Sequence, residues 1–356
     1  MATNAGMKAI AKEEKRMEKE RKRQVELANK MLIPAGKKTL ETLGLISFDP
    51  KGVFRLKENR WMSVFLLSGD FKALARKSLS LSGRIRIVWH LGEEGGRETC
   101  HLILMENGEI YEEVRQLMSK DLDLIKEVVK LTPLSVDEVM QSIIEKFGQN
   151  IRFSYASYVR GNKDWKKECF LEIKEEAEKF IVGSSFGEAF YALSYPSILK
   201  EGFMESLSHL GCQAFLSLDM NSLTDEEQLD FNRAIEKRYN KRLKFSEEDN
   251  YLNVSLALVI LCDSDDAREI IEKTVIALAN NYDIMLSISF HEQRAVTESV
   301  LMSLLLYMVC QHTRHLREQR KASSFWAVVK LCLASQIISV TIAALVGQKK
   351  HCLPLQ

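Results

Sequence analysis

The stretch from Phe180 to Asn221 limits the choice of folds more than any other part of this chain. Its first part is predicted to be an extended hairpin, in which Gly183 and Gly187 allow the backbone to turn tightly. Pro196 then disfavours helix at the residue before it, and Gly211 stands where the C-terminal cap of a short helix belongs. A strand follows that glycine. The order strand, helix, strand predicts a βαβ unit.

Alternating helices and strands are predicted as far as Phe290. The capping box Thr224-x-x-Glu227 opens a long helix that ends near Leu243. The run YLNVSLALVIL predicts a buried strand, residues 265–280 an amphipathic helix and residues 284–290 a final strand. This order predicts an α+β sandwich of the ferredoxin-like kind, with helices on one face of a mainly antiparallel sheet. We expect its apolar residues to be buried together, namely Leu258, Ile260, Ile270, Val275, Leu278 and Ile288.

The first half of the chain also predicts strands and helices. The run VFRLKENRWMSVFLL predicts two short strands. RIRIVWHL and ETCHLILM alternate apolar and polar residues around a glycine-bearing turn, as antiparallel hairpins do. Helices are predicted over residues 71–81 and 110–131, the second ending before Pro133. A further helix, opened by the capping box Ser135-x-x-Glu138, closes at Gly148.

These patterns divide the chain into four parts. Residues 1–33 are a charged helical arm, residues 34–150 a first subdomain, residues 168–300 a second subdomain and residues 301–356 an apolar tail. We place the boundary in residues 150–167, which are polar and aromatic without a clear period. The predicted fold class is therefore α+β, with two mixed antiparallel-sheet-and-helix subdomains, the second a ferredoxin-like two-layer sandwich.

Charge and cysteine content narrow the classes of protein. A net charge of +1, from 50 basic and 49 acidic residues, gives no global field that would draw in DNA, so nucleic acid is not an expected partner. The 7 cysteines never form a C-x-x-C pair, which disfavours a disulfide framework and a zinc knuckle. Scattered cysteines of this kind indicate a reducing cytoplasm. No secretory signal is expected, because the first thirty residues are charged.

The two terminal segments each keep more than one interpretation. Residues 8–30 are a helix-favouring run of Lys, Glu and Arg, typical of a solvated helix or of an arm that binds a partner or acidic lipids. Residues 322–347 are long enough to span a membrane only if Lys330 and Gln336 are tolerated. A single-pass membrane helix, a helix buried in the domain or in a partner, and unselected sequence all stay open for this apolar run.

Motifs that carry chemistry are mostly absent. No glycine begins a G-x-x-x-x-G-K-[ST] phosphate loop, so ATP hydrolysis is not expected. His312 and His315 lie in a basic stretch without acids or cysteines at ligand spacing, which favours a solvated helix face over a metal site. Ser184 and Ser185 lack the strand–turn–helix context of a nucleophile elbow. The sequence therefore predicts no catalytic, cofactor-binding or metal-ligating residues, and no cofactor.

An enzymatic hypothesis nevertheless stays open. His90 and His101 lie on predicted strands where they could face each other across a hairpin, and Glu106 follows on the second strand. Such histidines are far more often structural than catalytic. A cleft in which the three side chains converge with shifted pKa values would support an enzyme.

One family resemblance covers roughly Leu45 to Leu301. The run FGEAFYALSYPSILKEGFMESLSHLGCQAFLSLDMNSL is followed by YLNVSLALVILCDSDDAREIIEKTVIALANNYDIMLSISFHEQRAVTESVL. Together they resemble the amino-terminal region of the large conjugation ATPases of type IV secretion systems, the VirB-type, TraE/TrbE-like proteins. The matching features are an aromatic strand before Tyr195-Pro196, a helix that ends Leu210-Gly211 and the closing segment Phe290–Gln293. The earlier KGVFRLKENRWMSVFLLSG is similar to the opening strands of the Gram-positive members.

The resemblance implies docking rather than catalysis. Members of that family continue into a RecA-like motor, whereas this chain reaches Gln356 without a phosphate loop, so we expect a motorless paralogue or a reading frame lost near Leu301. The expected function is a non-catalytic assembly module of a conjugative DNA-transfer apparatus. Expected partners are channel components and further copies of the chain, with inner-membrane contact through residues 322–347. The expected location is the cytoplasm, peripheral to or anchored in the cell membrane. A membrane-tethered interaction protein unrelated to secretion is the alternative.

Overall fold

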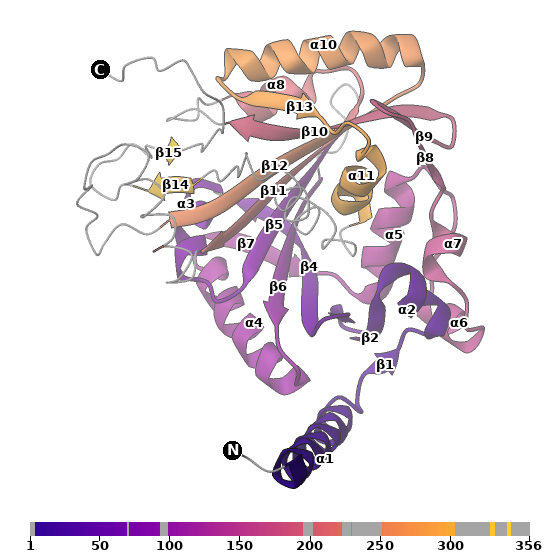
Figure 1. Cartoon of the computed structure of the whole chain (residues 1–356). Coiled ribbons are helices and arrows are strands. Elements are labelled where there is room, and N and C mark those ends of the chain that lie inside the picture. Colours follow the sequence, from indigo (N-terminus) through magenta and orange to yellow (C-terminus); the bar gives the residue numbers. More distant parts are fainter. Residues whose placement is uncertain are drawn as a thin grey trace.

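The computed structural model describes residues 4–69, 71–92, 99–194, 202–222, 229, 251–302, 328–331 and 340–342. The strands of the first half are β1 (Ile33–Pro34), β2 (Leu45–Asp49), β3 (Val53–Leu56), β4 (Arg60–Gly69), β5 (Arg84–Leu91), β6 (Thr99–Asn107) and β7 (Val129–Pro133). The later strands are β8 (Ile173–Glu175), β9 (Phe180–Val182), β10 (Ser185–Ser194), β11 (Gln213–Ser222), β12 (Tyr251–Cys262), β13 (Met285–Ile288), β14 (Val328–Leu331) and β15 (Val340–Ile342). The described strands join in one antiparallel sheet (Figure 1).

Helices connect and cover these strands. The helices of the first half are α1 (Asn4–Ala28), α2 (Lys37–Leu43), α3 (Phe71–Lys77), the 3-10 helix η1 (Ser78–Ser80), α4 (Tyr111–Lys126) and α5 (Val136–Lys146). Those of the second half are α6 (Tyr155–Arg160), α7 (Trp165–Cys169), α8 (Phe203–Ser208), α10 (Asp265–Asn281) and α11 (Gln293–Met302). The predicted capping box of α5 is confirmed, because the Ser135 side chain and the Glu138 carboxylate accept each other's backbone N–H. The predicted α+β class is confirmed.

Each half contains the same ferredoxin-like unit. In the first half the chain order is β4, α3, β5, β6, α4, β7, and the order across the sheet is β7-β4-β6-β5. In the second half β10, α8, β11, β12, α10 and β13 give the order β13-β10-β12-β11. Numbered along the chain, both orders are 4-1-3-2, with all neighbours antiparallel. This is the arrangement that we expected for the second half only.

The flanking elements repeat as well. A helix and a hairpin precede each unit, α2 with β2–β3 in one case and α7 with β8–β9 in the other, and a helix follows each unit, α5 and α11. The first strand of each unit also pairs on one side with two strands in succession, β4 with β3 and β7, and β10 with β9 and β13. The described fold is therefore an internal duplication.

The two copies meet edge to edge through equivalent strands. β5 and β11 pair antiparallel over seven residue pairs, with Val88 opposite Ser217 at the centre. Equivalent helices also touch each other across this junction, α2 with α7 and α5 with α11. Antiparallel contact between equivalent elements is what a two-fold relation produces. The two halves are thus arranged as a pseudo-two-fold dimer within one chain.

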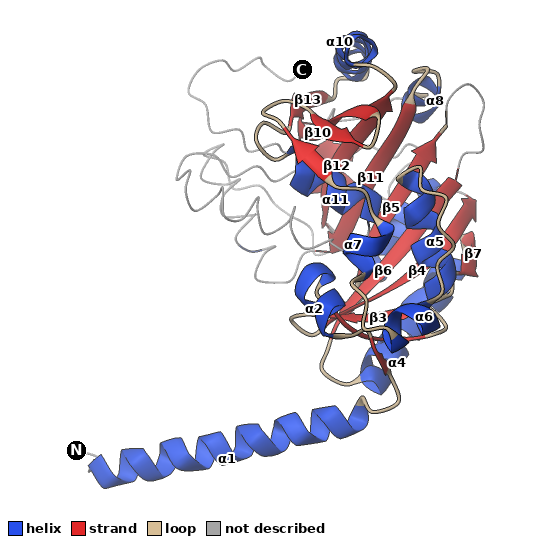
Figure 2. Cartoon of the chain, turned by 90° about the vertical axis from the view of Figure 1, so that its right-hand side faces the viewer, coloured by secondary structure: helices blue, strands red, loops and turns tan. Residues whose placement is uncertain are grey.

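Alternation along the junction strands separates two helical layers. Ile85 and Ile87 of β5 face a core with α3 and α4, while the next residue, Val88, faces the opposite core, which includes α5 and α7. In the second copy, α8 and α10 cover the same face of the sheet as α3 and α4. Leu216 of β11 packs in the core beneath α8 and α10, and its neighbour Phe215 packs on the opposite face, in the core that includes α5 and α7. Figures 1 and 2 show α5, α7 and α11 together on one side of the sheet.

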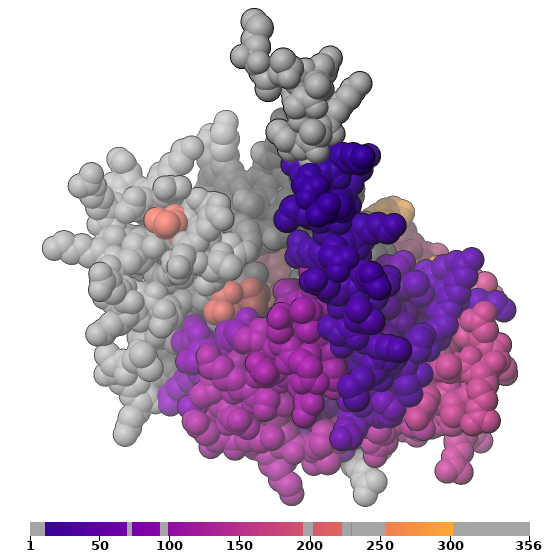
Figure 3. Space-filling model, turned by 90° about the horizontal axis from the view of Figure 1, so that it is seen from below, coloured from indigo at the N-terminus to yellow at the C-terminus, as the bar shows by residue number. Residues whose placement is uncertain are grey.

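The helix α1 stands outside this layered body. Residues 11–24 are exposed along their whole length, which fits the solvated-arm interpretation. The helix is held at its C-terminal end, where Arg21 forms two hydrogen bonds with the Glu109 carboxylate at 3.0 and 2.8 Å. The Asn29 side chain adds bonds to the backbone on either side of Ile110. Figures 2 and 3 show α1 projecting from the body.

Three sequence predictions need correction. The helix predicted to reach residue 131 ends at Lys126, and its last predicted turn is instead strand β7, because β4 offers an open edge to Val129–Pro133. Ile270, expected in the core, is 65% exposed because it lies on the outer side of α10. Residues 150–167 are not irregular throughout but form α6 and the start of α7, and Trp165 is fully buried.

Other predictions are not decided by the described residues. The sheet runs without a break from one predicted subdomain to the other, so proteolytic separation of the two stays a prediction. The helix predicted over residues 224–243 lies outside the described residues, apart from Leu229. In the apolar tail, β14 pairs with the start of β12 and with β15, and the rest of residues 322–347 lies outside the described residues.

Leu258→Ala should destabilise the protein by about 2–5 kcal/mol, because Leu258 is fully buried between the sheet and α10 and its truncation leaves a cavity. Ile270→Ala in the same unit is the control, and should change stability by about 0.5 kcal/mol or less because the side chain is exposed. Urea unfolding measures both. Equal effects of the two substitutions would contradict the assignment of the second core.

Candidate docking surface

The residues of the enzymatic hypothesis do not converge on one site. His90 and His101 both face α5, since His101 lies opposite Val88 and His90 is two residues further along β5. Glu106 lies opposite Trp61, whose side chain packs in the core of α3 and α4 on the other face of the sheet. The histidines are therefore brought together as expected, and the glutamate is separated from them by the sheet.

Burial governs the titration of the two histidines. Desolvation, with a smaller effect of the Lys146 charge, lowers the pKa of His90 to about 4 and that of His101 to about 3. Both rings are consequently neutral at pH 7. A ring held neutral by burial suits a structural role, and no carboxylate among the described residues hydrogen-bonds to either ring.

Glu106 belongs to a buried acidic contact that fixes the start of β5. Desolvation and the neighbouring Asp121 raise its pKa to about 7, although a hydrogen bond from Ser82 opposes the shift. The Asp121 carboxylate in turn accepts hydrogen bonds from the backbone N–H groups of Ser82 and Gly83 at 3.1 and 2.8 Å. The site is tightly closed, since a Cβ on Gly83 would lie 2.5 Å from a Glu106 oxygen. This contact joins α4 to the sheet.

A second buried charge network ties α10 to the sheet. Arg268 is 6% exposed and donates to the Glu188 carboxylate of β10 at 2.6 Å. It also donates to Asp265 at 2.7 Å and to Glu272 at 3.2 Å on its own helix. These contacts use most of the hydrogen-bond donors of the guanidinium, which favours a structural role for the network. No group of three metal-ligating side chains occurs in the part of the chain that the structure describes.

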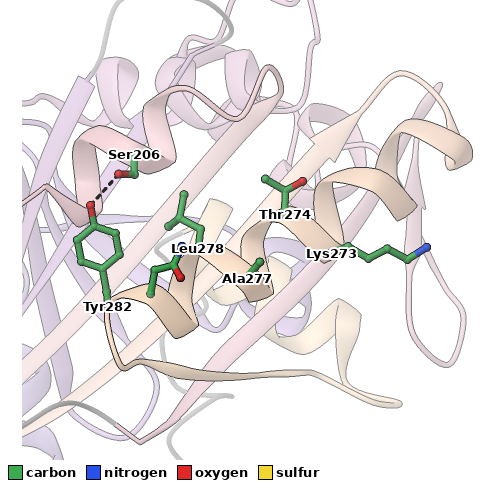
Figure 4. A pocket seen from close by; sticks show the side chains of 7 residues that line it. Ser206, Lys273, Thr274, Ala277, Leu278 and Tyr282 are labelled. Carbon is green, nitrogen blue, oxygen red and sulfur yellow. Dashed lines mark hydrogen bonds between the residues drawn. The ribbon is translucent and has the colours of Figure 1, made fainter.

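An open groove lies on the outer surface between α8 and α10, with a volume of about 790 Å³ (Figure 4). At one end the hydroxyls of Ser206 and Tyr282 are hydrogen-bonded at 2.8 Å, which links α8 to the end of α10. Ala277 lies midway along the α10 residues that line it. We call this feature the α10 groove, and its lining residues are Ser206, Lys273, Thr274, Ala277, Leu278, Asn281 and Tyr282.

The α10 groove is suited to receive another helix. Ile270, Thr274, Ala277 and Asn281 recur at helical spacing and are all exposed, so they form one stripe along α10. Small side chains at its centre, Thr274 and Ala277, allow a second backbone to approach closely. The stripe carries no acidic residue. The sequence did not predict this exposed stripe, because the apolar period of residues 265–280 placed Ile270 in the core.

A second surface hollow lies in the first copy. It has a volume of about 670 Å³ and lies where α4 ends and β7 begins. Its lining residues are Ser68, Gly69, Lys126, Glu127, Val128, Val129, Lys130 and Leu131. Both hollows adjoin the C-terminal end of the second helix of their unit. A surface depression thus occurs in each copy.

Comparison with known proteins does not assign this surface. No protein-family model matches the chain, and no curated protein matches it. Solved structures similar to it include GilR with pregilvocarcin, an oxidoreductase that catalyses the terminal step of gilvocarcin biosynthesis, at 9% identity and a TM-score of 0.31 over 64% of this chain and 42% of that one. Another is 6-hydroxy-D-nicotine oxidase from Arthrobacter nicotinovorans, at 10% identity and a TM-score of 0.31 over 74% of this chain and 52% of that one.

These likenesses are too distant to bear on function. The matched region spans about half the length of those two chains.

Concerning membranes, none of the helices in the described ranges combines the length and the apolar character needed to cross a bilayer.

Glu106→Gln should remove a pH dependence from folding stability. Because burial raises the pKa of Glu106 from 4.5 to about 7, the folded protein binds more protons than the unfolded chain between these values. Its stability should therefore fall as the pH rises from about 4.5 to 7. Glutamine keeps a donor toward Asp121 but does not titrate. Urea unfolding across this range should show a smaller loss for the variant, and identical pH slopes would contradict the assignment.

Proposed function

We propose that this chain is a non-catalytic assembly and docking module of a conjugative DNA-transfer, type IV secretion, apparatus. The observation that carries the proposal is the α10 groove, an open depression lined by residues of α8 and α10. The exposed stripe of α10 runs along it, and the middle residues of that stripe, Thr274 and Ala277, are small. Protein partners commonly bind such grooves through one face of a helix. The sequence resemblance to the amino-terminal region of the conjugation ATPases supplies the identity of the apparatus.

The placement of the groove supports docking in a second way. α10 is anchored to the sheet by the buried Arg268–Glu188 ion pair and by the apolar residues Val275 and Ala279, both fully buried. A helix fixed in this way presents its outer stripe with little freedom to lose on binding, which lowers the entropic cost of association. The projecting helix α1 offers a further exposed surface at the opposite end of the molecule.

The two other candidate functions have less support. An enzyme would need a converging set of titratable groups, whereas His101 and Glu106 lie on opposite faces of the sheet. A membrane-tethered interaction protein would depend on residues 322–347, most of which lie outside the described residues. The absence of catalysis and the membrane contact both stay predictions.

Ala277→Arg should weaken binding to a membrane component of the transfer channel by at least about tenfold, because a long charged side chain would fill the centre of the α10 groove. The matched control is Ser119→Arg on α4, the equivalent helix of the first copy, where the side chain is also exposed. Purified channel components and the full chain would be tested by titration.

Two outcomes separate the parts of this proposal. If a channel component binds tightly and Ala277→Arg does not change its affinity, the α10 groove is not the binding site, although the proposed docking function still holds. Failure of every channel component to bind the unaltered chain would reject the function itself.

A further inference from the structure

The exposed part of α1 carries most of its positive charges on one side. Its basic residues recur at spacings of three and four, which place them on the same face of a helix. They cover about a third of the helix circumference and extend over about 17 Å of its length. We call this feature the basic face, and its members, all exposed, are Lys12, Lys15, Arg16, Lys19, Lys22 and Arg23.

The acidic residues of the same segment lie outside the basic face. They are Glu13, Glu14, Glu18 and Glu20. Contact between the two signs occurs only at the margins, where Arg16 pairs with Glu13 at 3.4 Å. Lys22 pairs with Glu18 at 2.6 Å on the other margin. Like charges three or four residues apart destabilise a helix, whereas opposite charges at that spacing stabilise it. The separation of the two signs therefore costs α1 stability, and a partner of negative charge would offset that cost.

The basic face is turned away from the body of the protein. Arg21, which donates to the Glu109 carboxylate of the body, follows Lys19 by two residues and lies about 200° further around the helix. α1 also projects from the body, as Figures 2 and 3 show. The exposed basic face can therefore meet a flat surface along its whole length.

Exposed apolar side chains continue the basic face toward the end of α1. Leu27 follows Arg23 by about one helical turn and is 60% exposed. Met31 lies four residues beyond Leu27 and is 89% exposed. Helices that bind a membrane surface combine basic side chains with apolar ones, which enter the boundary between lipid headgroups and acyl chains. A phosphate backbone of nucleic acid offers no such apolar environment.

We propose that α1 lies on the surface of an anionic phospholipid bilayer, with its basic face against the lipid phosphates. Clusters of four to eight Lys and Arg residues on a helix are typical of segments that bind acidic lipids. Leu27 and Met31 enter the headgroup region beside the basic face. This inference goes beyond the proposed docking function and does not depend on it.

The margins of the basic face favour a bilayer over duplex nucleic acid. The major groove encloses a helix on both sides, so Glu13 and Glu20 on one margin and Glu18 on the other would meet phosphates. On a flat bilayer the same glutamates turn toward water.

The test uses the full chain and vesicles of phosphatidylglycerol and phosphatidylcholine in equal amounts. The unaltered protein should sediment with these vesicles far more than with phosphatidylcholine alone, and added salt should release it. The double variant Lys15→Glu with Lys19→Glu should weaken the vesicle affinity by at least about tenfold. The matched control is Lys120→Glu with Lys167→Glu, which alters exposed residues of α4 and α7, changes the net charge equally and should keep the affinity.

Two further measurements separate lipid binding from other causes. Circular dichroism of the double variant should show as much helix as the unaltered protein, because the substitutions replace like charges by opposite ones. Leu27→Gln should weaken the vesicle affinity by at least about threefold, because an amide does not enter the headgroup boundary as favourably. Equal affinity for both kinds of vesicle, or an affinity that neither the double variant nor Leu27→Gln lowers, would overturn the proposal. Tighter binding of duplex DNA than of anionic vesicles would overturn it as well.

Discussion

The ion pair between Arg86 and Asp219 is the interaction on which the arrangement of the two copies depends. The guanidinium and the carboxylate lie directly opposite each other on β5 and β11, and join through two hydrogen bonds of 2.7 and 2.6 Å. Burial would raise the pKa of Asp219, but Arg86 together with Arg84 outweighs burial and lowers it. Removing one partner of such a buried pair costs about 3–5 kcal/mol. The junction therefore tolerates little sliding of one copy against the other.

This constraint also reaches the helical layer. Arg86 uses its remaining nitrogen to donate to the hydroxyl and the carbonyl of Ser299 on α11, at 2.8 and 2.9 Å. One side chain of the first copy thus fixes a strand and a helix of the second. The resulting sheet supports α10, which presents its outer face to solvent. Under the proposed docking function, such a support would keep the outer surface of α10 ordered before a partner binds.

The sequence predicted local structure better than it predicted the relation between the halves. Capping at Ser135 and the apolar period of residues 265–280 act over a few residues, and both helices form where expected. The duplication was not predicted, since the two copies share a topology rather than a visible motif. β7 was missed because pairing with β4 overrides helix propensity.

The buried charges left a weak sequence signal. Arg86 and Asp219 are charged residues flanked on both sides by apolar residues of their strands, and a charge buried at such a position needs a partner of opposite charge. Their pairing could not be predicted, because it depends on the register between β5 and β11, which lie far apart in the chain. Lys146 gave no signal, since a lysine in the last turn of a helix is favourable in its own right. Its burial depends on tertiary packing, which the local sequence does not reveal.

The most direct test of this account is residue-resolved native-state hydrogen exchange of the full chain. We predict that the amides bonded between β5 and β11 exchange with the same high opening free energy as those within each copy, because one sheet unfolds as one unit. The account would be contradicted if the junction amides exchanged rapidly while the pairs β4–β6 and β10–β12 stayed protected. That result would mean that the two copies are separate domains without a fixed junction.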